Sequence, residues 1–147
     1  MAYVECKVWS FDKELEEEDE RYEAMKEGLA DHCKVEALID TTSNFNIISK
    51  RIVNRLRLKY NRKLTANQKK LKGIVGYVSC LDLSFQDELM SGNDEVLNDF
   101  EVVKKPKADL ILGLPWLWLR ESVIDIHNNK FSIYGRFVPL CEPSVED

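Results

Sequence analysis

The sequence predicts a mostly β fold with a few helices, and three stretches carry that prediction. Apolar and polar residues alternate over residues 3–9 and again over residues 74–85, which is the period of a half-buried strand. A third stretch, residues 33–39, is mainly apolar and is followed directly by Asp40, Thr41 and Thr42. That pattern predicts a buried strand that delivers one carboxylate to a tight polar turn.

Length and composition indicate one globular domain over residues 1–147. The chain has 147 residues, 44% of them hydrophobic and 32% charged, which is enough for a core and ordinary for a globular protein. No apolar run approaches the length of a membrane span, and the first residues lack the basic start and apolar stretch of a signal peptide. We therefore expect no membrane contact and a cytoplasmic or nuclear protein that is not secreted.

The spacing of the cysteines argues against a metal centre. No two of them form a Cys-x-x-Cys pair, and only His32 and His127 could join them as ligands. We expect no metal, no cofactor and mostly buried thiols in strands. The four cysteines are Cys6, Cys33, Cys80 and Cys141.

Charge is strongly segregated along the chain, whose net charge is −5. Residues 12–31 are rich in acids, whereas residues 41–81 contain bases and no acid. We rank two solvated faces of opposite charge above dedicated partner surfaces. Nucleic-acid binding through residues 50–72 ranks lower still, because the stretch has few aromatic residues and the protein is acidic overall.

Two helices are predicted from apolar residues at helical spacing, and Pro115 predicts the first turn of a third. An apolar stripe (Ile48, Ile52, Val53 and Leu56) predicts a helix of about three turns within residues 45–56. The acidic residues 10–32 carry apolar residues at helical spacing, which predicts a helix on the domain surface with Asp12 as its N-cap.

The C-terminal third is expected to contain short strands. Residues 100–103 predict one strand, and residues 123–126 and 130–133 predict a hairpin with asparagines in its turn. Residues 139–147, with two prolines and an acidic end, predict a loose tail.

Two motifs resemble those of retropepsin-like aspartic proteases, in the branch of gypsy-type LTR retrotransposons and the cellular genes derived from them. The first is Leu38-Ile39-Asp40-Thr41-Thr42-Ser43 with Asn46-Ile47-Ile48-Ser49 after it. The second is Asp109-Leu110-Ile111-Leu112-Gly113-Leu114-Pro115-Trp116-Leu117, which agrees with the family's segment almost residue for residue. The resemblance covers about residues 35–133 and implies a single-lobe, β-barrel-like acid protease fold.

The resemblance also assigns roles to residues. Asp40 would be catalytic, Thr41 would brace the active site across a dimer, and Ser43 would support the loop. Residues 64–73 resemble the flap that closes over an extended peptide, and within it we expect Ala66, Asn67 and Gln68 to bind substrate. Ile111, Leu112 and Gly113 form the structural signature, in which the missing side chain of Gly113 lets the backbone pass close to the active-site loop.

Compared with that family, the chain carries two extra segments. The family joins its first two strands by a tight hairpin, whereas here residues 10–32 form an acidic helical insertion between them. Residues 86–98 are polar, contain the turn sequence Ser91-Gly92-Asn93-Asp94, and form a second insertion.

Aspartic proteases activate water between two carboxylates that share one proton. The chain offers one such residue, Asp40, since Asp109 and Asp125 match structural positions; a working site would need a homodimer. Thr42 stands where the family has glycine, in the catalytic loop. Two hypotheses follow: an aspartic endopeptidase that cleaves a peptide or protein substrate, or a catalytically weak or dead domain that binds a peptide or protein.

Overall fold

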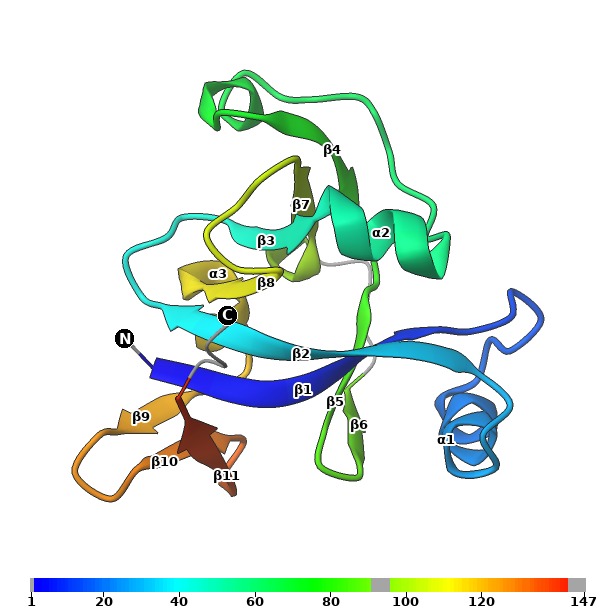
Figure 1. The fold of residues 1–147 in the computed structure, drawn as a ribbon, viewed down its shortest axis with the longest axis vertical. Helices are drawn as coiled ribbons and strands as arrows, with labels where there is room; N and C mark the ends of the chain where they lie inside the picture. The colour runs from blue at the N-terminus through cyan, green and yellow to red at the C-terminus, as the bar shows by residue number, and fades with distance from the viewer. Residues whose placement is uncertain (1, 91–95, 143–147) are drawn as a thin grey trace, which may run out of the picture.

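The computed structural model describes residues 2–90 and 96–142, whose strands join into one sheet (Figure 1). No helix in this part of the chain is long and apolar enough to cross a membrane. In chain order the elements are β1 (Ala2–Ser10), α1 (Glu18–Lys26), β2 (Asp31–Asp40), β3 (Asn46–Ser49), α2 (Lys50–Leu56), the 3-10 turn η1 (Gln68–Lys70), β4 (Ile74–Val78), β5 (Asp82–Phe85), β6 (Glu88–Met90), the 3-10 turn η2 (Val96–Asn98), β7 (Phe100–Val103), β8 (Leu110–Gly113), α3 (Leu114–Leu119), β9 (Val123–Asp125), β10 (Lys130–Ile133) and β11 (Arg136–Cys141).

The sheet places the two sequence motifs side by side. Its strand order is β4-β7-β3-β8-β2-β1-β11-β10-β9, and β5 pairs with β1 and β6. Strand β2 runs parallel to β8, with Leu38 opposite Ile111 and Asp40 opposite Gly113. In Figure 1 the end of β2 therefore lies against β8 at the point where α3 begins.

The main core lies on one face of the curved sheet. In β1 the alternate residues Val4, Cys6 and Val8 are buried, as the period of a half-buried strand requires. Trp116 of α3 packs in this core against Phe85 of β5, with ring centroids 5.7 Å apart. Burial of these large side chains is the main driving force for closing the sheet around α2 and α3.

The helix expected over residues 45–56 is only partly present, because residues 46–49 form strand β3. Strand β3 lies between β7 and β8, and its isoleucines Ile47 and Ile48 are both buried. Burial on both faces explains why the run lacks alternation and was mistaken for one face of a helix. The helix α2 begins after Ser49, whose hydroxyl accepts a hydrogen bond from the Ile52 amide at 3.3 Å.

The single long strand expected over residues 74–85 is in fact two strands. β4 pairs with β7, whereas β5 pairs with β1 and β6, so the chain changes partners between them. Cys80 lies at this change with a φ of 59°. A β-bulge lies between Ile74 and Gly76 of β4, and a Cβ at Gly76 would lie 2.4 Å from the Asn61 carbonyl oxygen.

The acidic segment contains the expected helix, but Asp12 is not its cap. α1 begins after Glu17, which makes no side-chain capping bond, while the Asp12 carboxylate accepts from the Glu14 amide at 3.2 Å. Arg21 attaches the helix to the body of the protein through an ion pair with Asp82 of β5 at 3.3 Å. Strands β1 and β2 remain paired as far as Ser10 and Asp31, so the helix extends from the end of a long hairpin.

Residues 86–98 and the C-terminal region contain more strand than expected. β6 forms a hairpin with β5, and the turn predicted at residues 91–94 lies outside the described residues. The loose tail predicted from residue 139 is wrong for residues 139–141, which belong to β11. This strand pairs with both β1 and β10, because Val138 is buried in the core and Leu140 packs against it. Residues 143–147 lie outside the described residues.

Candidate active site

Asp40 is the last residue of β2, and its carboxylate is held by the turn that follows. The Asp40 loop (residues 40–45) starts with a tight turn in which the Ser43 amide donates to the Asp40 carbonyl at 3.2 Å. One carboxylate oxygen, Oδ1, accepts from the Thr42 amide at 3.0 Å and from the Thr42 hydroxyl at 2.6 Å. The side chain is 11% exposed, so one carboxylate is presented at the surface in a fixed orientation.

Thr42, which stands where the resembled family has glycine, fits the backbone of this loop. The φ angle of Thr42 is not positive, so the turn does not require the backbone conformation that favours glycine. The backbone amide still reaches the carboxylate, as the family glycine's would. The difference from glycine is the added hydroxyl, which occupies Oδ1.

The second carboxylate oxygen of Asp40 is also engaged. Lys107, in the loop between β7 and β8, places its Nζ 2.9 Å from Oδ2. Hydrogen bonds from the Thr42 side chain, and after them the Lys107 ammonium, hold the pKa of Asp40 below its usual value. The carboxylate of the single chain is therefore stabilised in its ionised form.

Gly113 lets the second motif cross directly under the Asp40 loop. A Cβ at Gly113 would lie 2.1 Å from the Phe45 carbonyl oxygen and 3.2 Å from that of Ser43. The Leu114 amide donates to the Ser43 carbonyl at 2.9 Å, and the Ser43 hydroxyl donates to the Phe45 carbonyl at 2.6 Å. Ser43 and Gly113 thus fix the loop to the start of α3.

A small apolar cluster lies on the same face of β2 as the Asp40 side chain. Leu38 is two residues before Asp40 and therefore points to the same face. It packs with Ile47, Val103 and Ile111, and Leu71 from the flap segment (residues 64–73) covers this cluster. Asp40 is thus next to a buried apolar cluster, against which Leu71 of the flap segment packs.

The flap segment is attached to the sheet through Gln68. Its side-chain amide donates to Glu101 of β7 at 3.0 Å, and its own loop is closed by Thr65, whose amide donates to Gln68 Oε1 at 2.8 Å. Burial raises the pKa of Glu101 to about 7. Ala66 and Asn67 are exposed at the turn before η1.

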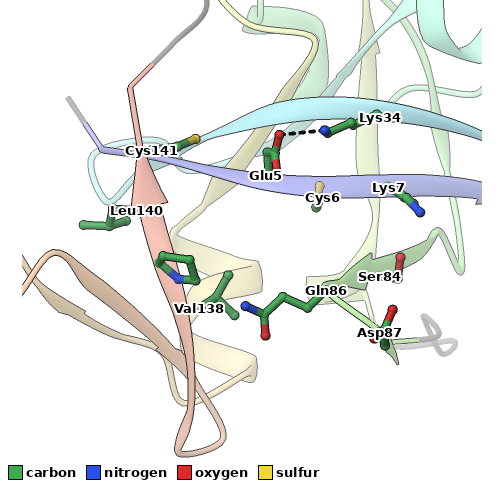
Figure 2. Close-up of a pocket in the computed structure, with 11 residues that line it drawn as sticks. Glu5, Cys6, Lys7, Lys34, Ser84, Gln86, Asp87, Val138, Leu140 and Cys141 are labelled. Carbon is green, nitrogen blue, oxygen red and sulfur yellow. Dashed lines mark ion pairs between the residues drawn. The ribbon is translucent and has the colours of Figure 1, made fainter.

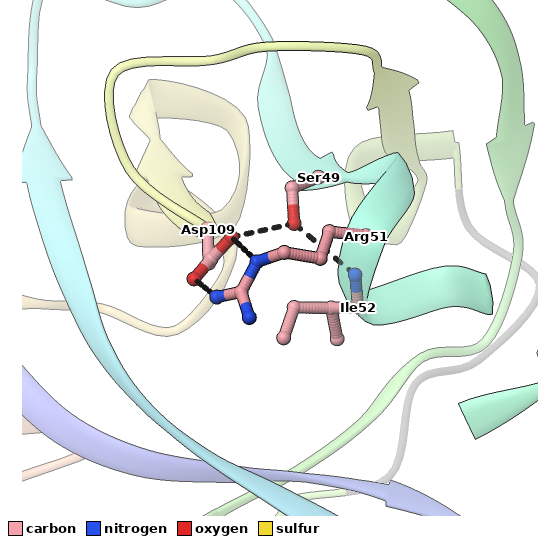
Figure 3. A network of polar contacts seen from close by, with 4 residues as sticks. All are labelled: Ser49, Arg51, Ile52 and Asp109. Carbon is pink, nitrogen blue, oxygen red and sulfur yellow. Dashed lines mark hydrogen bonds and ion pairs between the residues drawn. The ribbon is translucent and has the colours of Figure 1, made fainter. Parts of the chain in front are cut away.

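Asp109 is part of a structural network rather than a second active-site carboxylate (Figure 3). Its Oδ1 accepts from the Ser49 hydroxyl at 2.7 Å, and its carboxylate forms an ion pair with Arg51. Since Ser49 also caps α2, the network joins the start of β8 to the start of that helix. Asp125 is likewise occupied, because Asn128 donates to both of its oxygens across the β9–β10 turn.

An apolar groove of about 830 Å³ begins beside the Asp40 loop. Thr41 is among its lining residues, most of which are apolar side chains from α3 and the segment after it, including Leu114, Trp118 and Val123. Trp118 is 70% exposed and Val123 is 59% exposed, which is unusual for side chains of this size and polarity. We call this surface the Thr41 groove.

A separate cavity of about 330 Å³ lies between β1, β5 and β11 and contains two of the cysteines (Figure 2). Figure 2 shows Glu5, paired with Lys34 at 2.9 Å, and Cys6 on opposite sides of β1. Burial raises the pKa of the Cys6 thiol, so the thiol stays neutral and unreactive.

All four cysteines lie in the described part of the chain and none forms a disulfide; Cys6 and Cys33 are buried in strands, while Cys80 lies in a turn. Within residues 2–90 and 96–142, no three His, Cys, Asp or Glu side chains are grouped as metal ligands would be.

Sequence reasoning missed two residues of this region. Lys107 gave a weak signal, as one of three lysines just before the second motif, but nothing showed that its side chain reaches Asp40. Glu101 gave a clearer one, because it is an acid inside the apolar run of β7 and is 5% exposed. An acid in a buried strand needs a partner, and here the partner is Gln68.

Comparison with known proteins supports the resemblance and the fold. The family model described as the PEG10/RTL1 protease domain matches residues 36–137. The crystal structure of the retroviral protease-like domain of Ddi1 from Leishmania major superposes with a TM-score of 0.66 at 20% identity, covering 98% of each chain. In a direct comparison, no curated protein sequence matches the chain. The predicted retropepsin-like resemblance and the mostly β acid protease fold are confirmed.

Proposed function

Because the chain belongs to the PEG10/RTL1 protease domain family, we propose that it is an aspartic endopeptidase whose Asp40 pairs with the partner subunit's Asp40. The observation that carries the proposal is the placement of Asp40. Its carboxylate is held by the Thr42 amide at the end of a buried strand, where Gly113 lets the second motif cross beneath the loop. This arrangement holds one carboxylate in a fixed position beside a buried apolar cluster.

The chemistry requires two such carboxylates and one proton between them. The ionised carboxylate removes a proton from water, and the protonated one polarises the carbonyl of the scissile peptide bond. The water oxygen forms a bond to that carbonyl carbon, and the C–N bond breaks as the leaving nitrogen takes up a proton. An extended peptide fits this reaction, because the flap segment and the sheet edge can bind its backbone.

The roles of two other aspartates, Asp109 and Asp125, support a dimeric site. Asp109 is held by Ser49 and Arg51, and Asp125 is held by Asn128, so both serve the fold. A second carboxylate for Asp40 would then come from a second copy related by a two-fold axis. The Thr41 groove supports this, since it is an exposed apolar surface continuous with the Asp40 loop.

A second candidate function is peptide or protein binding without cleavage. The observation that favours it is the engagement of both Asp40 oxygens, Oδ1 by Thr42 and Oδ2 by Lys107. A carboxylate satisfied in this way activates water poorly, while the flap segment could still hold an extended peptide.

Cleavage of a mixed peptide library between pH 4 and pH 8 (roughly the range over which carboxyl dyads titrate) distinguishes the two functions. The peptidase hypothesis predicts cleavage by the parent chain and none by Asp40→Asn. Asp87→Asn, the same change at an exposed aspartate in the β5–β6 turn, serves as the control and should cleave like the parent. Cleavage that persists in Asp40→Asn contradicts the peptidase hypothesis. Absence of cleavage across this range from both the parent and Lys107→Met, which lacks the ion pair to Oδ2, also contradicts it.

A further inference from the structure

The Lys107–Asp40 ion pair occupies the carboxylate oxygen that a second Asp40 would need. Thr42 already donates twice to Oδ1, and Lys107 Nζ lies 2.9 Å from Oδ2. A carboxylate that shares a proton with another carboxylate must present one oxygen to it. In the single chain, Thr42 does not donate to Oδ2, and this oxygen is instead bound to the Lys107 ammonium.

The position of Lys107 is set by a loop that is fixed at both ends. At the β7 end, the Lys104 amide donates to the Gly73 carbonyl at 3.0 Å. At the β8 end, Asp109 is bound to Ser49 and Arg51 (Figure 3). The backbone is therefore held on both sides of Lys107, and the side chain alone decides whether the ammonium contacts Asp40.

The pair is also easy to open. The Lys107 side chain is 57% exposed, so its ammonium can be solvated when it leaves the carboxylate. Exposed ion pairs contribute little to stability, because water competes for both partners. Rotation of one lysine side chain is thus enough to free Oδ2 without any change in the fold.

The charge of Lys107 matters for the reaction because it opposes the shared proton. A cation beside a carboxylate favours the ionised form, whereas the reaction needs one of the two carboxylates protonated. The other neighbours do not offset this effect: Gly113 of β8 has no side chain, and Thr41 and Thr42 are not titratable. Lys107 is the charged group that faces Asp40.

We propose that Lys107 is an autoinhibitory counter-ion, which must leave Asp40 before a second Asp40 can share a proton with it. The proposal rests on the peptidase function proposed above. Lys107 is a positioning residue, since it acts through Asp40 and not on the peptide. Dimer formation, or a peptide that supplies its own acidic group to Lys107, would release Asp40.

The test compares Lys107→Met with Lys105→Met in the full chain. Both lysines are exposed in the same loop, and methionine keeps the unbranched side chain while removing the charge. The first readout is the titration of the Asp40 carboxyl by carbon-13 NMR, which does not depend on activity. The second is the pH profile of peptide cleavage, which a purely structural role for Lys107 would not move.

We expect Lys107→Met to raise the pKa of Asp40. The high-pH limb of the cleavage profile, where activity declines, should move to higher pH. A shift of one unit raises the protonated fraction about tenfold at higher pH, so cleavage near neutral pH should rise by a similar factor. Lys105→Met should leave both readouts unchanged. Cleavage by Lys107→Met but not by the parent would also support the proposal.

Two results would overturn it. If the parent cleaves peptides and Lys107→Met leaves the Asp40 titration and the pH profile unchanged, the inference is wrong while the peptidase function stands. If neither chain cleaves although the titration moves, the ion pair is real but the peptidase function fails, and the inhibitory role fails with it.

Discussion

The α-carbon of Gly113 lies so close to Phe45 that a Cβ there would sit 2.1 Å from the Phe45 carbonyl oxygen. This contact joins the two motifs, because it is where the start of α3 passes under the Asp40 loop. The neighbouring atom is a backbone oxygen, which cannot rotate away as a side chain would. The geometry of the candidate active site therefore depends on the absence of a single methyl group.

Gly113→Ala should destabilise the protein by about 3 kcal/mol, since the new methyl group must displace backbone in a packed region. Urea unfolding measures the loss. Gly135→Ala is the comparison. A Cβ at Gly135 would have no neighbouring atom within 4 Å, but the φ of this residue is +79°. That substitution should cost about 1 kcal/mol from backbone strain alone. Equal losses in the two variants would contradict the packing argument.

Glu101 should make stability fall as the pH rises. Its pKa is raised from 4.5 to about 7 in the folded protein, so folding favours the protonated form. The stabilisation is complete below the unfolded pKa and is lost as the pH rises through the folded one. Glu101→Gln removes the titration and should be more stable than the parent at pH 8 by about 1–3 kcal/mol.

Urea midpoints measured for Glu101→Gln from pH 4 to pH 8 (roughly the window between and around the two pKa values) check this. Asp87→Asn is the control, since Asp87 is exposed in the β5–β6 turn and should leave the parent's pH dependence in place. A parent-like decline in Glu101→Gln would show that another group is responsible.

Thr42→Gly should raise the pKa of Asp40 and increase activity or dimerisation. The substitution removes the 2.6 Å hydroxyl bond to Oδ1 and leaves the amide bond, because the amide belongs to the backbone. Thr42→Ser keeps a hydroxyl and should keep the lowered pKa. NMR titration of Asp40, peptide cleavage and sedimentation measure the three properties. Our account of Thr42 is wrong if Thr42→Gly matches the parent in all of them.

Trp118→Ser should weaken the proposed dimer. Trp118 is 70% exposed in the Thr41 groove, and large aromatic side chains dominate the energy of interfaces. We expect the dimer dissociation constant to rise about tenfold or more, measured by analytical ultracentrifugation. Phe137→Ser, at a residue 63% exposed on β11 and outside the groove, should dimerise like the parent. Equal dimerisation of the two variants would place the interface elsewhere.

The sequence was sufficient for the fold, because its two motifs and its alternating strands are local patterns. The period-2 pattern of β1 and the glycine and proline around α3 are visible without the structure. The pattern failed where burial on both faces removes alternation, as in β3, which was assigned to a helix. It failed again at Cys80, where a continuous alternation hides a change of strand partners.

The site could be predicted only as far as its backbone. The positions of Asp40 and Gly113 could be predicted because both lie in sequence motifs: Asp40 follows an apolar strand, and Gly113 ends another. Lys107 is 67 positions from Asp40, and a flexible side chain on a loop leaves no such mark. The bond between Gln68 and Glu101 was missed for the same reason, since their proximity arises from the folded sheet.

In the proposed peptidase, one working site takes an Asp40 from each of two chains. The most direct test mixes parent chain with Asp40→Asn at constant total concentration, well above the dimer dissociation constant, and measures peptide cleavage. With random pairing, activity should follow the square of the parent fraction, so an equal mixture should retain about one quarter of the parent rate. Activity that falls in simple proportion to the parent fraction would show that a single chain carries the complete site, and would contradict the account.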